Sequence, residues 1–189
     1  MGRIAVIAVL LAALAACAQY SLVEAKKQTI GGAYTVEAQI AWSKRSEGKV
    51  EIWTVDGPAL EAVRFFKGLD DGDPLFKRPR GSGEKVKYPI YKTGMTPNDV
   101  MELTVDSIAR AGAGNVQASK LRPAQFGSVP GFRFELTFLS KSGLEMDGLA
   151  AGAAIEDKLY LILYTGARIH YYPKYRDHVE QLLASIETI

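Results

Sequence analysis

The chain has few of the residue types on which most metal sites and nucleophilic enzymes depend, since it contains one cysteine and two histidines. A single cysteine excludes an intrachain disulfide and a zinc site built from several thiolates. His170 and His178 do not have the HExxH spacing of a zinc protease, and no serine stands in a Gly-x-Ser-x-Gly elbow. The sequence therefore favours a protein without catalytic activity, and we expect neither a cofactor nor a metal.

An excess of charge of one sign is also lacking. The 23 basic and 21 acidic residues give a formal net charge of +2, which argues against a protein that binds nucleic acid. The longest apolar run, residues 4–14, is shorter than the roughly 20 residues that a membrane-spanning helix needs. A hydrophobic fraction of 48% and a charged fraction of 23% are typical of an ordinary globular domain.

The N-terminus has the three-part layout of a secretory signal: Arg3, the apolar run, and then small residues up to Cys17. The sequence Leu14-Ala15-Ala16-Cys17 resembles the lipobox of bacterial lipoproteins. The resemblance implies a diacylglyceryl group on the Cys17 sulfur, cleavage between Ala16 and Cys17, and often an acylated amino terminus. The alternative is a plain signal followed by a structural cysteine.

These features predict a signal peptide over residues 1–16, a lipidated N-terminus and tether over 17–28, and a single α+β domain over 29–189. Two or three acyl chains hold a protein at a membrane almost permanently, so no spanning helix is needed. Ala18 occupies the position where Asp favours retention in the inner membrane. We therefore expect a lipid-anchored protein of the cell envelope that faces the periplasm, at the outer membrane.

Three segments have the apolar spacing of amphipathic helices. Residues 56–69 begin with Asp56 as a cap and carry apolar side chains on one face. Residues 96–112 have Thr96 as the cap and a proline in the first turn. Residues 173–186 form the last predicted helix.

Strands are predicted from alternating or continuous apolar runs. Residues 131–139, 144–155 and 158–167 are joined by short turns and should form a three-stranded antiparallel meander. Two more strands are expected at 33–42 and 49–55. This order predicts an α+β fold with helices packed on a mostly antiparallel sheet of five to six strands.

The segments at 34–44, 131–167 and 180–186 together resemble the α/β/α sandwich shared by PsbP, the extrinsic photosystem subunit, and a Ran-binding import factor. The resemblance consists of element order and apolar placement, and it implies the fold alone. No binding residue follows from it.

Two regions are candidate binding sites. The basic loop 77–87 could contact anionic lipid head groups through its cations, or it could be a solvated loop without a partner. An apolar ligand pocket could be bordered by Trp53, Tyr164 and Tyr171, although aromatic residues on strands are more often core residues. The cations of the basic loop are Lys77, Arg78, Arg80, Lys85 and Lys87.

Three functions remain open on the sequence alone. The first is a non-catalytic envelope lipoprotein that serves as an interaction or assembly accessory, with membrane lipid and an unknown envelope protein as its partners. The second is a binding module that holds a small apolar or aromatic ligand between the sheet and a helix. The third is a hydrolase that uses His170, for which a serine or carboxylate would have to lie within about 3 Å of the imidazole.

Overall fold

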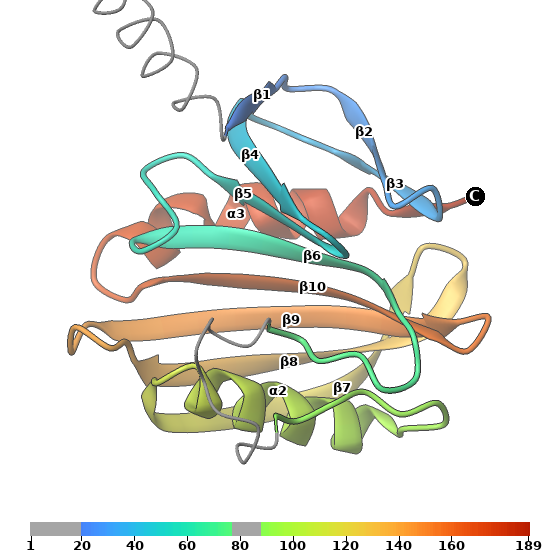
Figure 1. Ribbon diagram of the computed structural model, residues 1–189. Coiled ribbons are helices and arrows are strands. Elements are labelled where there is room, and N and C mark those ends of the chain that lie inside the picture. The colour runs from blue at the N-terminus through green and yellow to red at the C-terminus, as the bar shows by residue number, and fades with distance from the viewer. Residues whose placement is uncertain (1–19, 77–87) are drawn as a thin grey trace, which may run out of the picture.

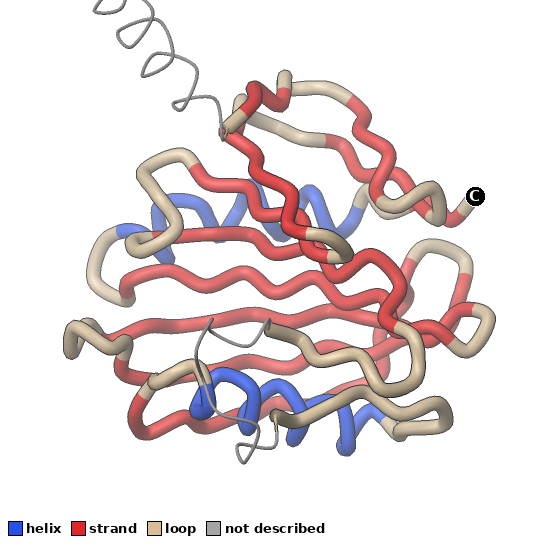
Figure 2. Tube along the Cα trace, viewed as in Figure 1, coloured by secondary structure: helices blue, strands red, loops and turns tan. Residues whose placement is uncertain are grey.

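The computed structural model describes residues 20–76 and 88–189 as a layered α+β structure (Figure 1). Strands form most of it, as Figure 2 shows. In chain order the elements are β1 (Ser21–Val23), β2 (Lys27–Ile30), β3 (Tyr34–Glu37), β4 (Trp42–Glu47), β5 (Val50–Thr54), β6 (Glu61–Leu69), α2 (Pro97–Arg110), β7 (Gly114–Phe126), β8 (Val129–Leu139), β9 (Glu145–Ile155), β10 (Lys158–Ala167), α3 (Tyr171–Ala184) and β11 (Glu187–Thr188).

The main sheet has eight strands in the order β1-β4-β5-β6-β10-β9-β8-β7, and every neighbouring pair is antiparallel. A second sheet of three strands, β11-β3-β2, joins the C-terminus to the N-terminal region. The predicted meander is confirmed as β8, β9 and β10. The expected sheet of five to six strands is too small, because β1, β4 and β7 were not foreseen as strands and β6 was predicted as a helix. The strand predicted at 33–42 forms β3, which belongs to the second sheet.

The two helices cover opposite faces of the main sheet. One core cluster joins α3 residues such as Val179 and Leu182 to Trp53 and Phe65 on the sheet. The other joins Val100 and Leu103 of α2 to a separate set of strand residues. In Figure 1, α2 lies in front of the sheet and α3 lies behind it. The predicted α/β/α layering is therefore confirmed.

The start of α2 follows the local chemistry that the sequence predicts. The Thr96 hydroxyl accepts a hydrogen bond from the Asp99 amide, while the Asp99 carboxylate accepts one from the Thr96 amide at 2.8 Å. This reciprocal capping box satisfies two amides that the helix itself cannot pair, and Pro97 supplies a fixed φ in the first turn.

The helix predicted at 56–69 is wrong, because residues 61–69 form the central strand β6. Phe65 packs in the cluster beneath α3, and Phe66 packs in the cluster beneath α2. A strand that is buried on both faces loses the polar alternation of a half-exposed strand, so spacing alone does not distinguish it from a buried helix. Pairing with β5 and β10 decided the outcome.

The predicted tether over 17–28 is also corrected from Ser21 onward. β1 pairs with β4 along Ser21–Val23, and the Val23 side chain is 1% exposed. β2 begins at Lys27, inside the same predicted segment. The N-terminal part of the chain therefore adds an edge strand to the main sheet.

Candidate functional site

An open cleft lies between the main sheet and the C-terminal end of α2, and we call it the α2 cleft. Its volume is about 430 Å³, within the range of roughly 300 to 1,000 Å³ that is usual for small-molecule sites. The residues that line it are mostly apolar: Pro58, Ala59, Arg64, Phe76, Ile108, Ala111, Ala113, Phe138, Ser140, Lys141, Ser142, Met146, Leu163 and Thr165.

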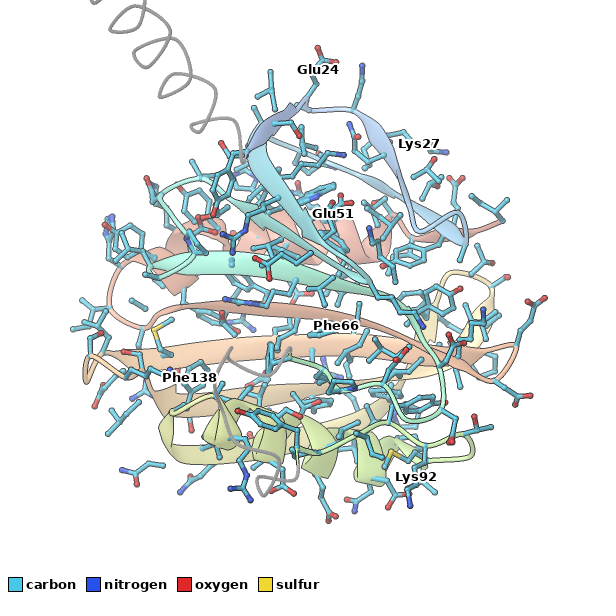
Figure 3. All side chains as sticks on the ribbon, viewed as in Figure 1. Glu24, Lys27, Glu51, Phe66, Lys92 and Phe138 are labelled. Atoms are coloured by element: carbon cyan, nitrogen blue, oxygen red, sulfur yellow. The ribbon has the colours of Figure 1, made fainter. Side chains whose placement is uncertain are left out.

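The cleft exists because α2 covers only part of its face of the sheet. The helix packs over β7 and β8 and ends near Ala111, so no helix of the described residues covers the neighbouring part of β6 and β10. Phe138, labelled in Figure 3, lies near this end of α2. At the other end of the same face, Phe66, Leu75 and Tyr91 are fully buried, and a smaller hollow of about 240 Å³ lies beside Tyr91 and the start of α2.

Arg64 supplies the charged group on the sheet side of the cleft. Its side chain is half-buried, and Nη1 donates a hydrogen bond to Thr165 Oγ1 at 3.0 Å. Burial lowers the pKa of Arg64 from its ordinary value, but an arginine remains protonated in proteins. No carboxylate of the described residues forms an ion pair with it. The cleft thus combines apolar walls with two cations, the half-buried Arg64 on the sheet and the exposed Lys141 at the rim.

The three aromatic residues predicted to border a ligand pocket do not lie at the α2 cleft. Trp53 and Tyr164 are completely buried in the core cluster on the α3 face, and Tyr171 is half-buried at the start of α3. None of the three lines the α2 cleft. The Tyr164 hydroxyl donates to the Tyr172 carbonyl at 2.9 Å, and burial raises the pKa of Tyr164 well above its ordinary value. These residues hold α3 on the sheet.

Sequence reasoning missed the α2 cleft because its walls come from segments far apart in the chain. One local signal was present, since Arg64 interrupts the otherwise apolar run Ala62–Phe66. A charged residue within a buried strand needs a polar partner or an opening to solvent. The assignment of this segment to a helix concealed that signal.

A polar junction ties the β5–β6 loop to α3. Asp56 accepts hydrogen bonds from Lys174 at 2.8 Å and from the Tyr175 hydroxyl at 2.5 Å. The Lys174 ammonium group, and then the Tyr175 hydroxyl, hold the pKa of Asp56 below its ordinary value. Asp56 was expected to cap a helix, and it instead connects a loop to the helix on the far side of the sheet.

The histidines do not form the geometry that a hydrolase needs. His170 is exposed, and its ring contacts Tyr171 with a centroid distance of 4.9 Å. Among the described residues, no serine or carboxylate forms a hydrogen bond with its imidazole. Nδ1 of His178 is buried and has no hydrogen-bond partner among the described residues. Within residues 20–76 and 88–189, no group of His, Cys, Asp and Glu side chains has the arrangement of a metal site.

Several predicted sites lie outside the described residues. These are the cleavage site at Ala16 and Cys17 and the cations Lys77, Arg78, Arg80, Lys85 and Lys87. In the part of the chain that the structure describes, no helix is long and apolar enough to cross a membrane.

Comparison with known proteins gives likenesses of structure only. No family model matches the chain, and no curated protein matches it. The solution structure of cyanobacterial PsbP from Synechocystis sp. PCC 6803 is similar to it with a TM-score of 0.44 and 13% identity, over 91% of this chain and 83% of that chain. LpqN of Mycobacterium tuberculosis, described as involved in cell envelope biogenesis, gives a TM-score of 0.40 and 8% identity, over 90% of this chain and 79% of that chain.

The first of these likenesses names the family that the sequence resembles. Both TM-scores are below 0.5, so neither likeness carries an inference about what this chain binds or where it acts. The function is therefore argued from the residues of the chain itself.

Proposed function

We propose that this protein is a non-catalytic binding module of the cell envelope that holds a small apolar ligand in the α2 cleft. The observation that supports the proposal is the cleft itself, an apolar hollow between the sheet and one end of α2. A concave, mostly apolar site with a few polar groups is the usual form of a small-molecule site.

The contrast with the α3 face supports this assignment. There, large side chains such as Trp42, Trp53 and Tyr34 are completely buried and interlock. Protein interiors normally pack as tightly as organic crystals. An open apolar cleft beside this tight packing is therefore suited to an added molecule.

The test is binding of a neutral apolar probe. N-phenyl-naphthylamine should gain fluorescence with the mature protein, and dodecanol should displace it. Ala113→Phe places a large ring at a position that lines the cleft and should weaken probe binding by about tenfold or more, since a filled site excludes the ligand. Ala109→Phe is the matched control, because Ala109 is exposed on α2 and does not line the cleft.

Equal binding by both variants would show that the probe sits elsewhere on the protein. Failure of the mature protein to bind either molecule would remove the proposal altogether.

The anchoring of the module rests on the lipobox Leu14-Ala15-Ala16-Cys17. We propose that acylated Cys17 holds the domain at the periplasmic side of the envelope, at the outer membrane. Intact-mass analysis of the natural product should show loss of residues 1–16 and addition of lipid at Cys17. Cys17→Ser should leave a folded domain that no longer fractionates with membranes, and a membrane-bound Cys17→Ser protein would contradict the anchoring.

A second candidate function, an interaction or assembly accessory, is favoured by apolar residues at one end of the sheet. Val55, Leu144 and Ile169 are 42%, 41% and 91% exposed. They lie in the β5–β6, β8–β9 and β10–α3 connections, which backbone hydrogen bonds link through Ala167 and Arg168. Exposed apolar groups that gather on a surface often mark a protein interface.

Crosslinking in intact envelopes tests this second candidate. Photoreactive groups at Leu144 and Ile169 should give one reproducible protein adduct, and the same group at the exposed Asp106 of α2 should not. If the adduct is the same from all three positions, the contact is not specific to this end of the sheet.

A further inference from the structure

Arg64 has an unusual environment for a cation. It lies on the wall of the α2 cleft together with Ile108, Phe138 and Leu163, and its hydrogen bond to a described residue goes to the Thr165 hydroxyl. A guanidinium group has several N–H donors and is suited to binding an anion through two parallel hydrogen bonds. One hydroxyl acceptor leaves most of that capacity unused.

Two carboxylates, Glu47 and Glu61, act electrostatically on Arg64, but each interacts directly with other groups. Glu47 pairs with Arg45 at 2.6 Å. One oxygen of Glu61 accepts hydrogen bonds from the Thr54 hydroxyl at 2.7 Å and from the backbone amides of Val55 and Asp56. Both carboxylates influence Arg64 through the electrostatic field without forming an ion pair with it. The positive charge on the cleft wall therefore lacks a direct counterion among the described residues.

From this juxtaposition we infer that the ligand of the α2 cleft is an amphipathic anion, with a carboxylate or phosphate head group on Arg64 and Thr165 and an alkyl chain along Ile108, Phe138 and Met146. The inference rests on the proposed binding function and adds the chemical class of the ligand. Charge complementarity carries it, because an arginine in partly apolar surroundings binds an oxyanion more strongly than a solvated arginine does.

Thr165 Oγ1 lies beside the guanidinium and can donate its own proton to the same head group. The Ser140 and Ser142 hydroxyls at the rim already form a hydrogen bond with each other at 3.0 Å. The head group is therefore assigned to the Arg64 end of the cleft and not to this rim.

The experiment compares ligands that share one chain and differ in their head group. Dodecanoate, dodecyl phosphate, dodecanol and dodecyltrimethylammonium are titrated into the mature protein by calorimetry, each below its micelle concentration. Both anions should bind about tenfold or more tightly than dodecanol, and the cation should bind most weakly. A stronger response to one anion identifies carboxylate or phosphate as the natural head group.

Variants locate the charge. Arg64→Met keeps much of the side-chain length. It should lower the affinity for dodecanoate by about tenfold or more and change the affinity for dodecanol by about twofold or less. Arg64→Lys keeps the charge without the planar guanidinium group, and its affinity for dodecanoate should lie between those of the wild type and Arg64→Met. Lys92→Met removes one positive charge from an exposed residue that does not line the cleft, and should leave both affinities unchanged.

The outcomes separate the two proposals. If dodecanol and the anions bind equally and Arg64→Met has no effect, the head-group inference is overturned while the binding function stands. If Lys141→Met, rather than Arg64→Met, removes the preference for anions, the head group sits at the rim and the assignment is wrong. If no ligand binds at all, both proposals fail. Should Arg64→Met not fold, the comparison of the four ligands on the wild-type protein decides by itself.

Discussion

The strand β1 gives the sharpest test of the structure, because the sequence predicts a solvated tether in its place. Val23 is 1% exposed and packs in the core cluster beneath α3, while its neighbour Leu22 is 68% exposed. Successive side chains of a strand point to opposite sides. Val23→Ala and Leu22→Ala therefore form a matched pair, one on each side of the same short strand.

The expected magnitude follows from the burial of Val23. Truncation to alanine removes two methyl-sized groups, each contributing about 0.8 kcal/mol of transfer free energy. An added cavity term brings the loss in the free energy of unfolding to about 2 kcal/mol. Leu22→Ala should change it by about 0.5 kcal/mol or less, as surface substitutions usually do.

Urea unfolding followed by tryptophan fluorescence measures both variants, since Trp42 lies opposite Val23 in the β1–β4 pairing. With a slope of about 2 kcal/mol per molar urea, Val23→Ala should lower the midpoint by about 1 M. A midpoint equal to that of the wild type would refute the reasoning, because a residue in a solvated tether contributes nothing to folding.

Three further predictions address the cap of α2, the centre of the sheet and the loop–helix junction. Thr96→Ala removes one side of the capping box and should cost about 1 kcal/mol of unfolding free energy by the same urea assay. Gly152→Ala should lower the free energy of unfolding by about 1 to 3 kcal/mol, since its new methyl group would lie 2.7 Å from the Tyr160 carbonyl oxygen. Gly114→Ala is the control and should be nearly neutral, because the nearest atom to its new methyl group lies at 3.8 Å. Asp56→Asn should destabilise the protein at pH 7 and have progressively less effect as the pH falls below about 4. The pKa of Asp56 is lowered in the folded state, so its carboxylate stabilises the fold above the unfolded pKa. Protonation at low pH removes this contribution. Unfolding curves at pH 7 and pH 3 measure the difference, and an equal effect at both values would contradict it.

The elements that could be predicted from the sequence are those whose cause is local. Thr96, Pro97 and Asp99 specify the start of α2 within a few residues of one another, so their chemistry is readable in the chain. The turns after β8 and β9 are short, and short turns leave antiparallel pairing as the only arrangement for neighbouring strands.

Tertiary contacts decided the rest. Residues 61–69 became the central strand β6 because β5 and β10 pair with both of its edges, and packing on two faces outweighs helical spacing. β1 became a strand because β4 presents it with a free edge. The α2 cleft arises from where α2 ends relative to β6 and β10, a relation between distant segments. Local sequence determined the start of α2 and the short turns, and the pairing of remote strands determined that Arg64 lies on the wall of a cleft.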